Sequence, residues 1–427
     1  MSINNIMKMR MLYGVNQADA CQAFALGAAS GLIQQRLREI GTRMIRLFLY
    51  DKGAPDPVTE WPTFVSYVQA VLNVGATPMI TFAKMHKPAG DLEAVEEFAN
   101  RSADVVRRCI EQWGGDVVCD WYWCVWNEPN NEWISGPVTF AEYRRIYEQI
   151  ASRCLKLLKP YLRGRKALIG GPGVEGFQPF WMDWVWRFLN EIDNDLIGFL
   201  DWHFYGDWRE HGENNAPATA PEHRRLLMGL VHEYGTRARV IGQMLKGRQI
   251  LNICGELNCH SHYTQPVRER FNYSMFAAAY YTSALLQLMR NEVDAEMYWV
   301  GTEQEGGYGM MNEQGEPRPS YNAKKLCAQH VRYGDVISFP TGDAGDGGID
   351  AVVSAREDGA HNILIVHQRD EAATYEVAKL APIVDGLRTV LKLDHASSDR
   401  IVKTTYEGTI HFDGFGVAAI TTESSAH

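Results

Sequence analysis

Two glutamates lie at the ends of predicted strands, in surroundings that suit acid–base chemistry. Glu128 belongs to the run Trp126-Asn127-Glu128-Pro129-Asn130, the most distinctive short motif in the chain. Glu256 belongs to Gly255-Glu256-Leu257-Asn258, 128 residues further along. Two carboxyl groups that meet in one site can act as a general acid and as a nucleophile or base. Glu175 and Glu292 are rival second carboxylates, but both fit the strand-end pattern less well.

The elements that would position these glutamates are short apolar runs that alternate with amphipathic stretches. One stretch, Leu92–Trp113, has apolar residues at roughly helical spacing, and Thr139-Phe140-Ala141-Glu142 has the form of a helix capping box. Strands that alternate with helices predict a parallel sheet. The eight candidate strands are Leu12–Asn16, Met44–Leu49, Thr77–Phe82, Tyr122–Asn127, Ala167–Gly170, Gly198–His203, Ile250–Gly255 and Ala295–Val300.

Eight strand–helix units over roughly 320 residues fit a (β/α)8 TIM barrel, which typically has ~250 residues plus insertions. A doubly wound open sheet is the structural rival, although no Gly-x-Gly-x-x-Gly follows the first candidate strand. A barrel presents its catalytic groups at the carboxyl ends of its strands. We therefore expect Glu128 at the end of the fourth strand and Glu256 at the end of the seventh.

The pattern changes after residue 335. The segment Thr341–Gly348 has the composition of a linker or wide turn, and short alternating runs follow it, separated by Asp-Gly and Glu-Gly pairs typical of hairpin turns. We predict a catalytic barrel over residues 1–335 and a small antiparallel β-sandwich over residues 336–427. The predicted sandwich strands are Ala351–Ala355, Ile363–His367, Thr374–Leu380, Thr389–Leu393, Val402–Tyr406 and Gly416–Thr421.

The composition limits the class of protein. The 427 residues are 46% hydrophobic and 22% charged, which excludes a disordered, collagen-like or coiled-coil chain. The net charge of −10, without a basic stripe, argues against nucleic acid as a partner. The most apolar segment, Met275 to Met289, is too short to span a bilayer. Eight scattered cysteines and a start without a leader-like apolar stretch favour a cytoplasmic protein.

The Trp126–Asn130 motif resembles the acid/base signature of clan A glycoside hydrolases and is most similar to that of family 39, which includes β-xylosidases and α-L-iduronidases. The resemblance spans about residues 10–330 and is specific only around 121–147, 198–206 and 252–258. It implies a retaining glycoside hydrolase with carboxyl groups ~5–5.5 Å apart. Residues downstream of the motif also look similar to the family's strand-four loop and helix: Trp133, Gly136, Thr139, Tyr143 and Tyr147.

The resemblance assigns roles to three residues. Glu128 would be the acid/base and must hold a proton near neutral pH, which partial burial and the charge of Glu256 would favour. Glu256 would be the nucleophile and must stay ionised, helped by hydrogen-bond donors. Asn127 would bind the sugar 2-hydroxyl. Each residue also has a structural alternative. Glu128 could be an acid at a helix N-terminus, Glu256 an acid on a strand-to-loop turn, and Asn127 a turn-capping amide.

Three further polar residues are predicted near the nucleophile. His203, in Asp201-Trp202-His203, resembles the family's pattern and would contact the nucleophile or the sugar, with a satisfied core histidine as the alternative. Tyr205 would orient Glu256. Arg46, on the second strand, would pair with Glu256 and keep it charged, or would form a structural salt bridge in the barrel.

Four other residues are weaker candidates for contacts with substrate. Trp299, at the end of the eighth strand, and Trp133, beside the acid/base loop, would stack on sugar rings, with packing as the alternative for Trp299. Lys84 and His86, just past the third strand, would bind sugar hydroxyls or a carboxylate.

No cofactor or metal is predicted. Cys254, Cys259, His260 and His262 lie around Glu256, but without the paired spacing of a zinc site. Neither a P-loop nor a Gly-x-Ser-x-Gly elbow is present. The expected substrate is an oligosaccharide or glycoside, and an exo-acting β-xylosidase is the first hypothesis. An endo-acting polysaccharide hydrolase and a non-catalytic carbohydrate-binding barrel are the alternatives, and homo-oligomerisation through edges of the β-domain is left open.

Overall fold

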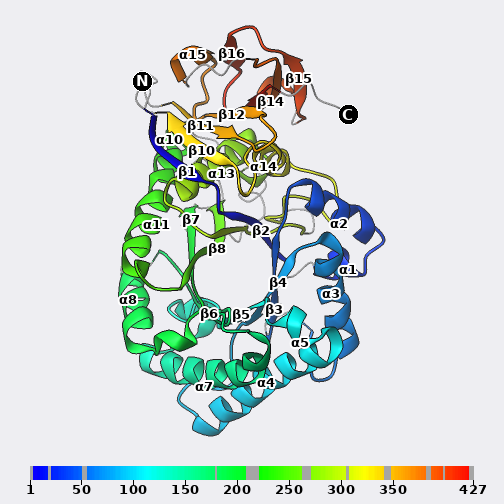
Figure 1. Cartoon of the computed structure of the whole chain (residues 1–427), viewed down its shortest axis with the longest axis vertical. Coiled ribbons are helices and arrows are strands. Elements are labelled where there is room, and N and C mark those ends of the chain that lie inside the picture. The colour runs from blue at the N-terminus through cyan, green and yellow to red at the C-terminus, as the bar shows by residue number, and fades with distance from the viewer. Residues whose placement is uncertain are drawn as a thin grey trace.

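The computed structural model describes residues 3–17, 21–50, 55–177, 180–207, 221–261, 271–303, 307–340, 348–380, 386–397 and 400–422. Its centre is a closed barrel of eight parallel strands surrounded by helices, which confirms the predicted (β/α)8 fold (Figure 1). The barrel strands follow one another in chain order: β2 (Leu12–Gln17), β3 (Met44–Leu49), β4 (Thr77–Phe82), β5 (Tyr122–Val125), β6 (Ile169–Val174), β7 (Phe199–Asp207), β8 (Leu251–His260) and β9 (Ala295–Tyr298).

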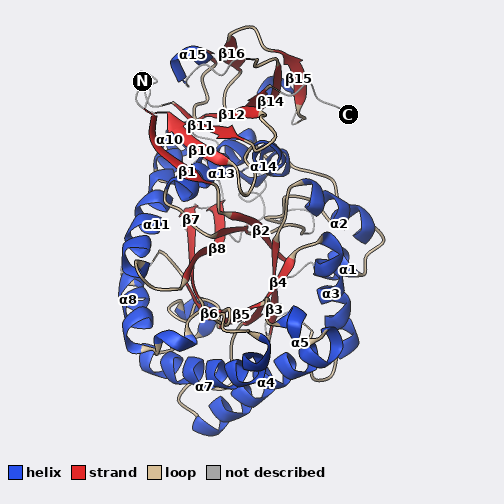
Figure 2. Ribbon diagram, viewed as in Figure 1, coloured by secondary structure: helices blue, strands red, loops and turns tan. Residues whose placement is uncertain are grey.

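The helices of the barrel cover the outside of the strands (Figure 2). The helix predicted over Leu92–Trp113 forms with the same bounds, and the capping box at Thr139 and Glu142 opens another, as predicted. The elements are α1 (Cys21–Ala25), α2 (Ser30–Glu39), α3 (Trp61–Val74), α4 (Leu92–Trp113), α5 (Gly115–Val118), α6 (Glu132–Ser135), α7 (Phe140–Leu158), η1 (Lys159–Tyr161), α8 (Trp181–Glu191), η2 (Asn194–Leu196), α10 (Pro221–Gly229), α11 (Val231–Leu245), α13 (Met275–Arg290) and α14 (Pro319–His330).

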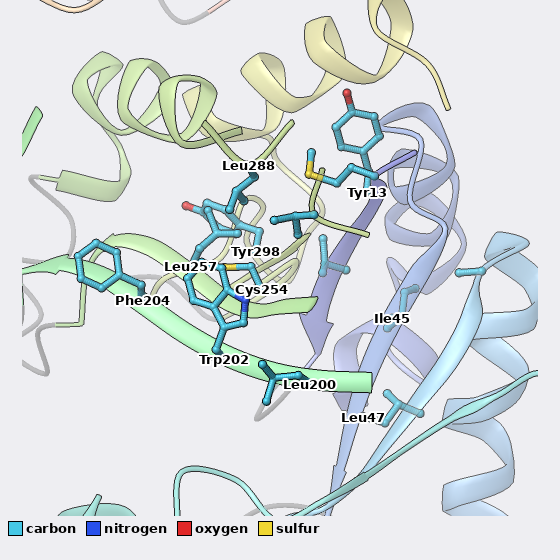
Figure 3. Close-up of a cluster of buried hydrophobic side chains, with 14 of the residues drawn as sticks. Tyr13, Ile45, Leu47, Leu200, Trp202, Phe204, Cys254, Leu257, Leu288 and Tyr298 are labelled. Atoms are coloured by element: carbon cyan, nitrogen blue, oxygen red, sulfur yellow. The ribbon is translucent and has the colours of Figure 1, made fainter. Parts of the chain in front are cut away.

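The two faces of each barrel strand have different partners, because successive side chains point to opposite sides. On β3, Ile45 and Leu47 belong to the large core between strands and helices, and on β7 Leu200, Trp202 and Phe204 do the same (Figure 3). The intervening residues on these strands therefore face the barrel interior. This alternation is what turns Arg46 and His203 inward.

The barrel interior has an apolar layer beneath its polar residues. A separate buried cluster contains residues from the early part of the strands: Met44, Met79, Tyr122, Cys124, Phe199, Ile253, Ala295 and Met297. The buried polar side chains Arg46, Asp201 and His203 come later on the same strands. Since parallel strands run in one direction, the polar residues gather towards the carboxyl ends, where a barrel builds its site.

The second domain is an antiparallel β-sandwich, as predicted. Its seven-stranded sheet has the order β1-β10-β11-β12-β17-β14-β15, and β13 pairs with β16 in a second sheet. A shared apolar cluster lies between the sheets, with Ile363 and Ile420 on one side and Ile410 and Phe412 on the other. The elements are β1 (Ile3–Lys8), β10 (Val336–Pro340), β11 (Ile349–Ala355), β12 (His361–His367), β13 (Ala373–Glu376), α15 (Val377–Leu380), β14 (Thr389–Asp394), η3 (His395–Ser397), β15 (Val402–Thr405), β16 (Thr409–Phe412) and β17 (Gly416–Thr421).

Part of the predicted domain division is wrong. Strand β1, at the start of the segment assigned to the barrel, pairs antiparallel with β10 and forms one edge of the sandwich. The predicted strand Thr374–Leu380 divides into β13 and α15. Strands β10 and β16 were not predicted, and nearly all of the predicted linker Thr341–Gly348 lies outside the described residues.

Helix α13 joins the two domains. Nearly all of its side chains are buried, because it packs against α11 and α14 of the barrel and also contacts β11, β12 and β17 of the sandwich. Phe276 meets Phe415 edge to face at 5.3 Å, and Arg290 forms a bidentate ion pair with Asp350. Burial against both domains explains the apolar composition of Met275–Met289. Within the described residues, none of the helices combines the length and apolar character that a membrane span requires.

Candidate active site

The loop after β5 holds Glu128 in a defined backbone conformation. Trp126 and Glu128 have positive φ angles of 78° and 50°, which are uncommon outside glycine. Backbone hydrogen bonds support this shape, because Asn127 N donates to Ala83 O at 2.9 Å and Glu128 N donates to Gly173 O at 2.9 Å. The loop is thereby tied to the ends of both neighbouring strands, β4 and β6.

A side-chain clamp from α6 closes the same loop. Ser135 Oγ lies 3.0 Å from the carbonyl oxygens of both Asn127 and Glu128, and Trp126 Nε1 donates to Ser135 Oγ at 2.9 Å. These contacts hold the loop of Glu128 against α6, the short helix that follows it.

Glu256 reaches the interior through an irregularity in β8. The register between β7 and β8 shifts after Trp202, so that His203 pairs with Glu256. Gly255 permits this arrangement, because a Cβ atom there would lie 1.8 Å from Asp201 Oδ1. The absence of a side chain at Gly255 therefore lets the buried Asp201 lie against the strand that carries Glu256.

The two predicted glutamates meet around one imidazole. Glu128 and Glu256 are 8% and 4% exposed, and each has an oxygen within 4.8 Å of the other and of a ring nitrogen of His203. His203 Nδ1 lies 2.8 Å from Glu128 Oε1 and 3.6 Å from Glu256 Oε1. This close approach of the carboxyl oxygens is compatible with the shorter, retaining spacing of ~5–5.5 Å between carboxyl groups.

Arg46 is the central cation of the site and is wholly buried. Its guanidinium lies 3.2 Å from Glu256 Oε1, 3.4 Å from Asp201 Oδ2 and 3.1 Å from Asn127 Oδ1. Tyr205 Oη completes the surroundings of Glu256 by donating to Oε2 at 2.6 Å. The contacts predicted for Arg46 and Tyr205 with Glu256 are therefore present.

The crowding of buried charges shifts the pKa values of the site. Burial, and then the charge of Glu128, raises the pKa of Glu256 to about 7, although His203, Arg46 and Tyr205 favour its carboxylate. Burial acts against protonation of His203, but the charges of Glu256, Asp201 and Glu128 outweigh it and raise the pKa of His203 to about 10. The His203 ring and the Arg46 guanidinium lie 3.1 Å apart, and both approach Asp201 Oδ2, at 3.7 and 3.4 Å.

Glu128, His203 and Glu256 are also the one group of potential metal ligands found among the described residues. Two carboxylates and an imidazole could bind a divalent ion. However, the Arg46 guanidinium lies 3.2 Å from the same Glu256 oxygen that approaches His203. A second cation there would be repelled by Arg46, so the donor set fits a metal poorly.

The other predicted contacts occupy less central positions. The Trp299 ring meets Phe48 edge to face at 5.7 Å, and Phe48 lies on the inward face of β3 beside Arg46. Trp133, on α6, is 94% exposed. Lys84 donates to the Ile134 carbonyl oxygen at 3.4 Å. Lys84 and the exposed His86 line a cavity at the start of α4. Neither Glu128 nor Glu256 lines this cavity.

The rival carboxylates are placed differently. Glu175 follows β6 and is buried, but its backbone is paired with the Asn130 side chain and its Oε1 accepts from Phe177 N at 2.5 Å. Glu292 lies on the turn before β9, and its side chain is 58% exposed. Glu292 is therefore at the opposite end of the strands from Glu128, which removes it as a partner.

Two residues of the site were missed in the sequence. Asp201 is fully buried, and the charges of Arg46 and His203 lower its pKa even though burial acts in the opposite direction. Its signal was an acid two positions before His203 on an apolar strand, which is the same face of the strand. Asn131 donates from Nδ2 to Glu128 Oε2 at 3.1 Å. The sequence feature that could have indicated Asn131 is its position three residues after Glu128.

The barrel brings two buried glutamates close together at the carboxyl ends of its strands, Glu128 after β5 and Glu256 on β8. The family model for glycosyl hydrolases family 39 matches residues 63–223. This chain is therefore similar to family 39 over that segment, which is less than half of its length.

Curated relatives and solved structures give the extent of the likeness. A β-xylosidase of Geobacillus stearothermophilus is 24% identical over 295 residues, which are 65% of this chain and 54% of that protein. A β-xylosidase of Caldicellulosiruptor saccharolyticus is 22% identical over 55% of this chain and 46% of its own length. The chain thus spans about half the length of these curated relatives.

Solved structures match over nearly the whole chain. A monomeric β-xylosidase from Caulobacter crescentus has a TM-score of 0.65 at 16% identity, covering 98% of this chain and 97% of that one. A family 51 α-L-arabinofuranosidase from Bifidobacterium longum has a TM-score of 0.66 at 13% identity, with coverage of 97% and 96%. Because proteins named for different sugars match equally well, these likenesses describe the fold and not the substrate.

Proposed function

We propose that this protein is a retaining glycoside hydrolase, with Glu256 as nucleophile and Glu128 as acid/base, and that its substrate is a β-xyloside. The observation that carries the proposal is the approach of the two carboxyl groups to within 4.8 Å at the carboxyl ends of β5 and β8. That spacing leaves room for one anomeric carbon and suits double displacement.

In the first step, the Glu256 carboxylate attacks the anomeric carbon. The bond to the leaving oxygen breaks, and Glu128 gives that oxygen its proton. The product is a glycosyl ester on Glu256, and Glu128 is left as a carboxylate. Arg46 and Tyr205 hold Glu256 in position for this attack through the contacts described above.

In the second step, Glu128 takes a proton from water while the water oxygen attacks the anomeric carbon. The ester bond breaks, Glu256 returns as a carboxylate, and the sugar keeps its original anomeric configuration. Asn127 is the proposed contact to the 2-hydroxyl. Its amide oxygen accepts from Arg46 at 3.1 Å, so its amide nitrogen is the group turned to the sugar.

The choice of a β-xyloside rests on the sequence relatives, both of which are named β-xylosidases. The rival activities are endo-hydrolysis of a polysaccharide and carbohydrate binding without catalysis. The presence of both carboxylates, each with its own donors, favours catalysis over binding alone.

The test compares wild type, Glu128→Gln and Glu256→Gln on aryl β-xylosides. Glu256→Gln should abolish turnover. Glu128→Gln should still release dinitrophenol, which leaves without a proton, and should lose activity on unactivated xylosides. Undiminished activity in both variants would refute the assignment. Polymeric xylan, assayed in parallel, separates endo from exo action, and binding without turnover in wild type would favour the non-catalytic alternative.

We also propose Trp299 and Trp133 as sugar-stacking platforms, with Trp133 on the leaving-group side. An exposed indole beside the acid/base loop offers a flat apolar face to a sugar ring. Trp133→Ala should raise KM for xylo-oligosaccharides and leave KM for a short aryl xyloside unchanged. Equal KM changes for both substrates would contradict this role.

We also propose a cytoplasmic location, supported by seven free and buried cysteines: Cys109, Cys119, Cys124, Cys154, Cys254, Cys259 and Cys327. Fractionation of the source cells followed by immunodetection would check it, and recovery in the external medium would contradict it.

A further inference from the structure

Asn131 contacts the acid/base directly from the start of α6. Its Nδ2 donates to Glu128 Oε2 at 3.1 Å, and its Oδ1 accepts from Trp133 N at 3.1 Å as the N-cap of that helix. We propose that Asn131 is a positioning residue for Glu128 and holds the carboxylate in the orientation that activates water. This inference rests on the proposed function and adds a residue to its mechanism.

The orientation of the Asn131 amide follows from its partners. A backbone N–H can only donate, so the atom that meets Trp133 N is the amide oxygen, and the amide nitrogen faces Glu128. Asn131 N also donates to Glu128 O at 3.0 Å, which closes a turn between the two residues. The amide cannot flip without losing the helix cap and the contact with Glu128 together.

The donor from Asn131 completes the hydrogen bonding of the Glu128 carboxylate. His203 Nδ1, from β7, meets Oε1 at 2.8 Å, and Asn131 meets Oε2, so each oxygen has a donor. The neighbouring charged groups come from two other strands, Glu256 from β8 and Arg46 from β3. Tyr205, also from β7, donates to Glu256.

Two donors on one carboxylate favour its ionised form. This matters most in the second half of the reaction, when Glu128 must accept a proton from water and point at it. Loss of the Asn131 donor should therefore slow breakdown of the glycosyl ester.

Two substitutions separate positioning from helix capping. Asn131→Ser keeps an oxygen suited to the N-cap but is too short to reach Glu128 with a donor. Asn131→Asp keeps the cap and replaces the donor with a charged acceptor. A purely structural role predicts that Asn131→Ser, which keeps the cap, behaves as wild type. Asn100→Asp, on the exposed face of α4, is the matched control for the added charge.

For Asn131→Ser we expect kcat on a dinitrophenyl xyloside to fall about tenfold, since one hydrogen bond to a charged group is lost. We also expect kcat/KM on the same substrate to change less than kcat, because release of dinitrophenol needs no proton from Glu128. Asn131→Asp should show both effects more strongly, and Asn100→Asp neither. An unchanged kcat in both Asn131 variants, at unchanged thermal unfolding, would overturn the proposal.

A second measurement does not depend on turnover. Thermal unfolding of wild type, Asn131→Ser, Glu128→Ala and the double variant forms a double-mutant cycle, in which a direct contact predicts effects that do not add. Additive effects would contradict the inference even in an active enzyme. A wild type without turnover would instead contradict the proposed function, and the cycle would still decide the role of Asn131.

Discussion

Replacing Tyr205 with phenylalanine would remove one hydrogen bond from the proposed nucleophile and leave the ring in place. Tyr205 Oη donates to Glu256 Oε2 at 2.6 Å, and burial raises the pKa of Tyr205, which keeps it a donor at neutral pH. A hydrogen bond to a charged group contributes about 1.5–3 kcal/mol, and one pH unit corresponds to about 1.4 kcal/mol. The substitution should therefore raise the pKa of Glu256 by about 1–2 pH units from its value of about 7.

The direction of the effect on activity follows from the role of Glu256. The nucleophile attacks as a carboxylate, so kcat/KM falls as the pH drops through its pKa. In Tyr205→Phe this acid limb should lie about 1–2 pH units higher than in wild type, and kcat/KM at pH 6 should fall about 10- to 100-fold. Above pH 9 the two enzymes should approach each other.

The assay is the pH dependence of kcat/KM on a dinitrophenyl xyloside, whose leaving group needs no proton, so that the acid limb reports Glu256. Tyr13→Phe is the control, because its hydroxyl donates to the Val331 carbonyl oxygen at 2.8 Å, far from the carboxyl ends of the strands. An acid limb that stays in place in Tyr205→Phe, or that moves equally in Tyr13→Phe, would refute this reasoning.

Three other substitutions test the supports of the site. Asp201→Asn breaks the buried pair with Arg46 and should lower the free energy of unfolding by about 3 kcal/mol in urea titrations; a loss below about 1 kcal/mol would contradict the pairing. Gly255→Ala should displace Asp201 and cut kcat/KM at least tenfold, since its Cβ would overlap Oδ1; normal kinetics would show that β8 adapts. Thr139→Ala removes the cap of α7 and should cost about 1 kcal/mol with kcat unchanged, as calorimetry and kinetics can check.

The agreement between expected and observed elements has a local cause. Helix α4 and the strands β3 and β4 formed with the predicted bounds, because their apolar spacing and end signals lie within a few residues. Strand β1 could not be placed in this way. It is an edge strand whose partner, β10, lies more than 300 residues away, and only long-range pairing assigns it to the sandwich.

The residues of the site show the same difference between local and long-range information. The motif around Glu128 was recognisable because its acid, its amides and its turn residue are consecutive in the chain. Asp201 was not recognised, because its partner in the buried ion pair, Arg46, is 155 positions away in the chain. Its close approach to Gly255 is likewise visible only in the folded structure. Asn131 was missed for a different reason: its contact with Glu128 depends on the backbone angles of one turn.

By itself, the amino-acid sequence determined the order of the barrel strands and which two acids stand at their carboxyl ends, since periodicity and turn residues act over short distances. Only the tertiary structure decided the pKa of Glu256, because that pKa depends on its burial and on the charged groups that surround it. Three acids, a guanidinium and an imidazole reach one another from β3, the loop after β5, β7 and β8. The Coulombic energy of these groups depends on the distances between their charges, and only the folded structure sets those distances.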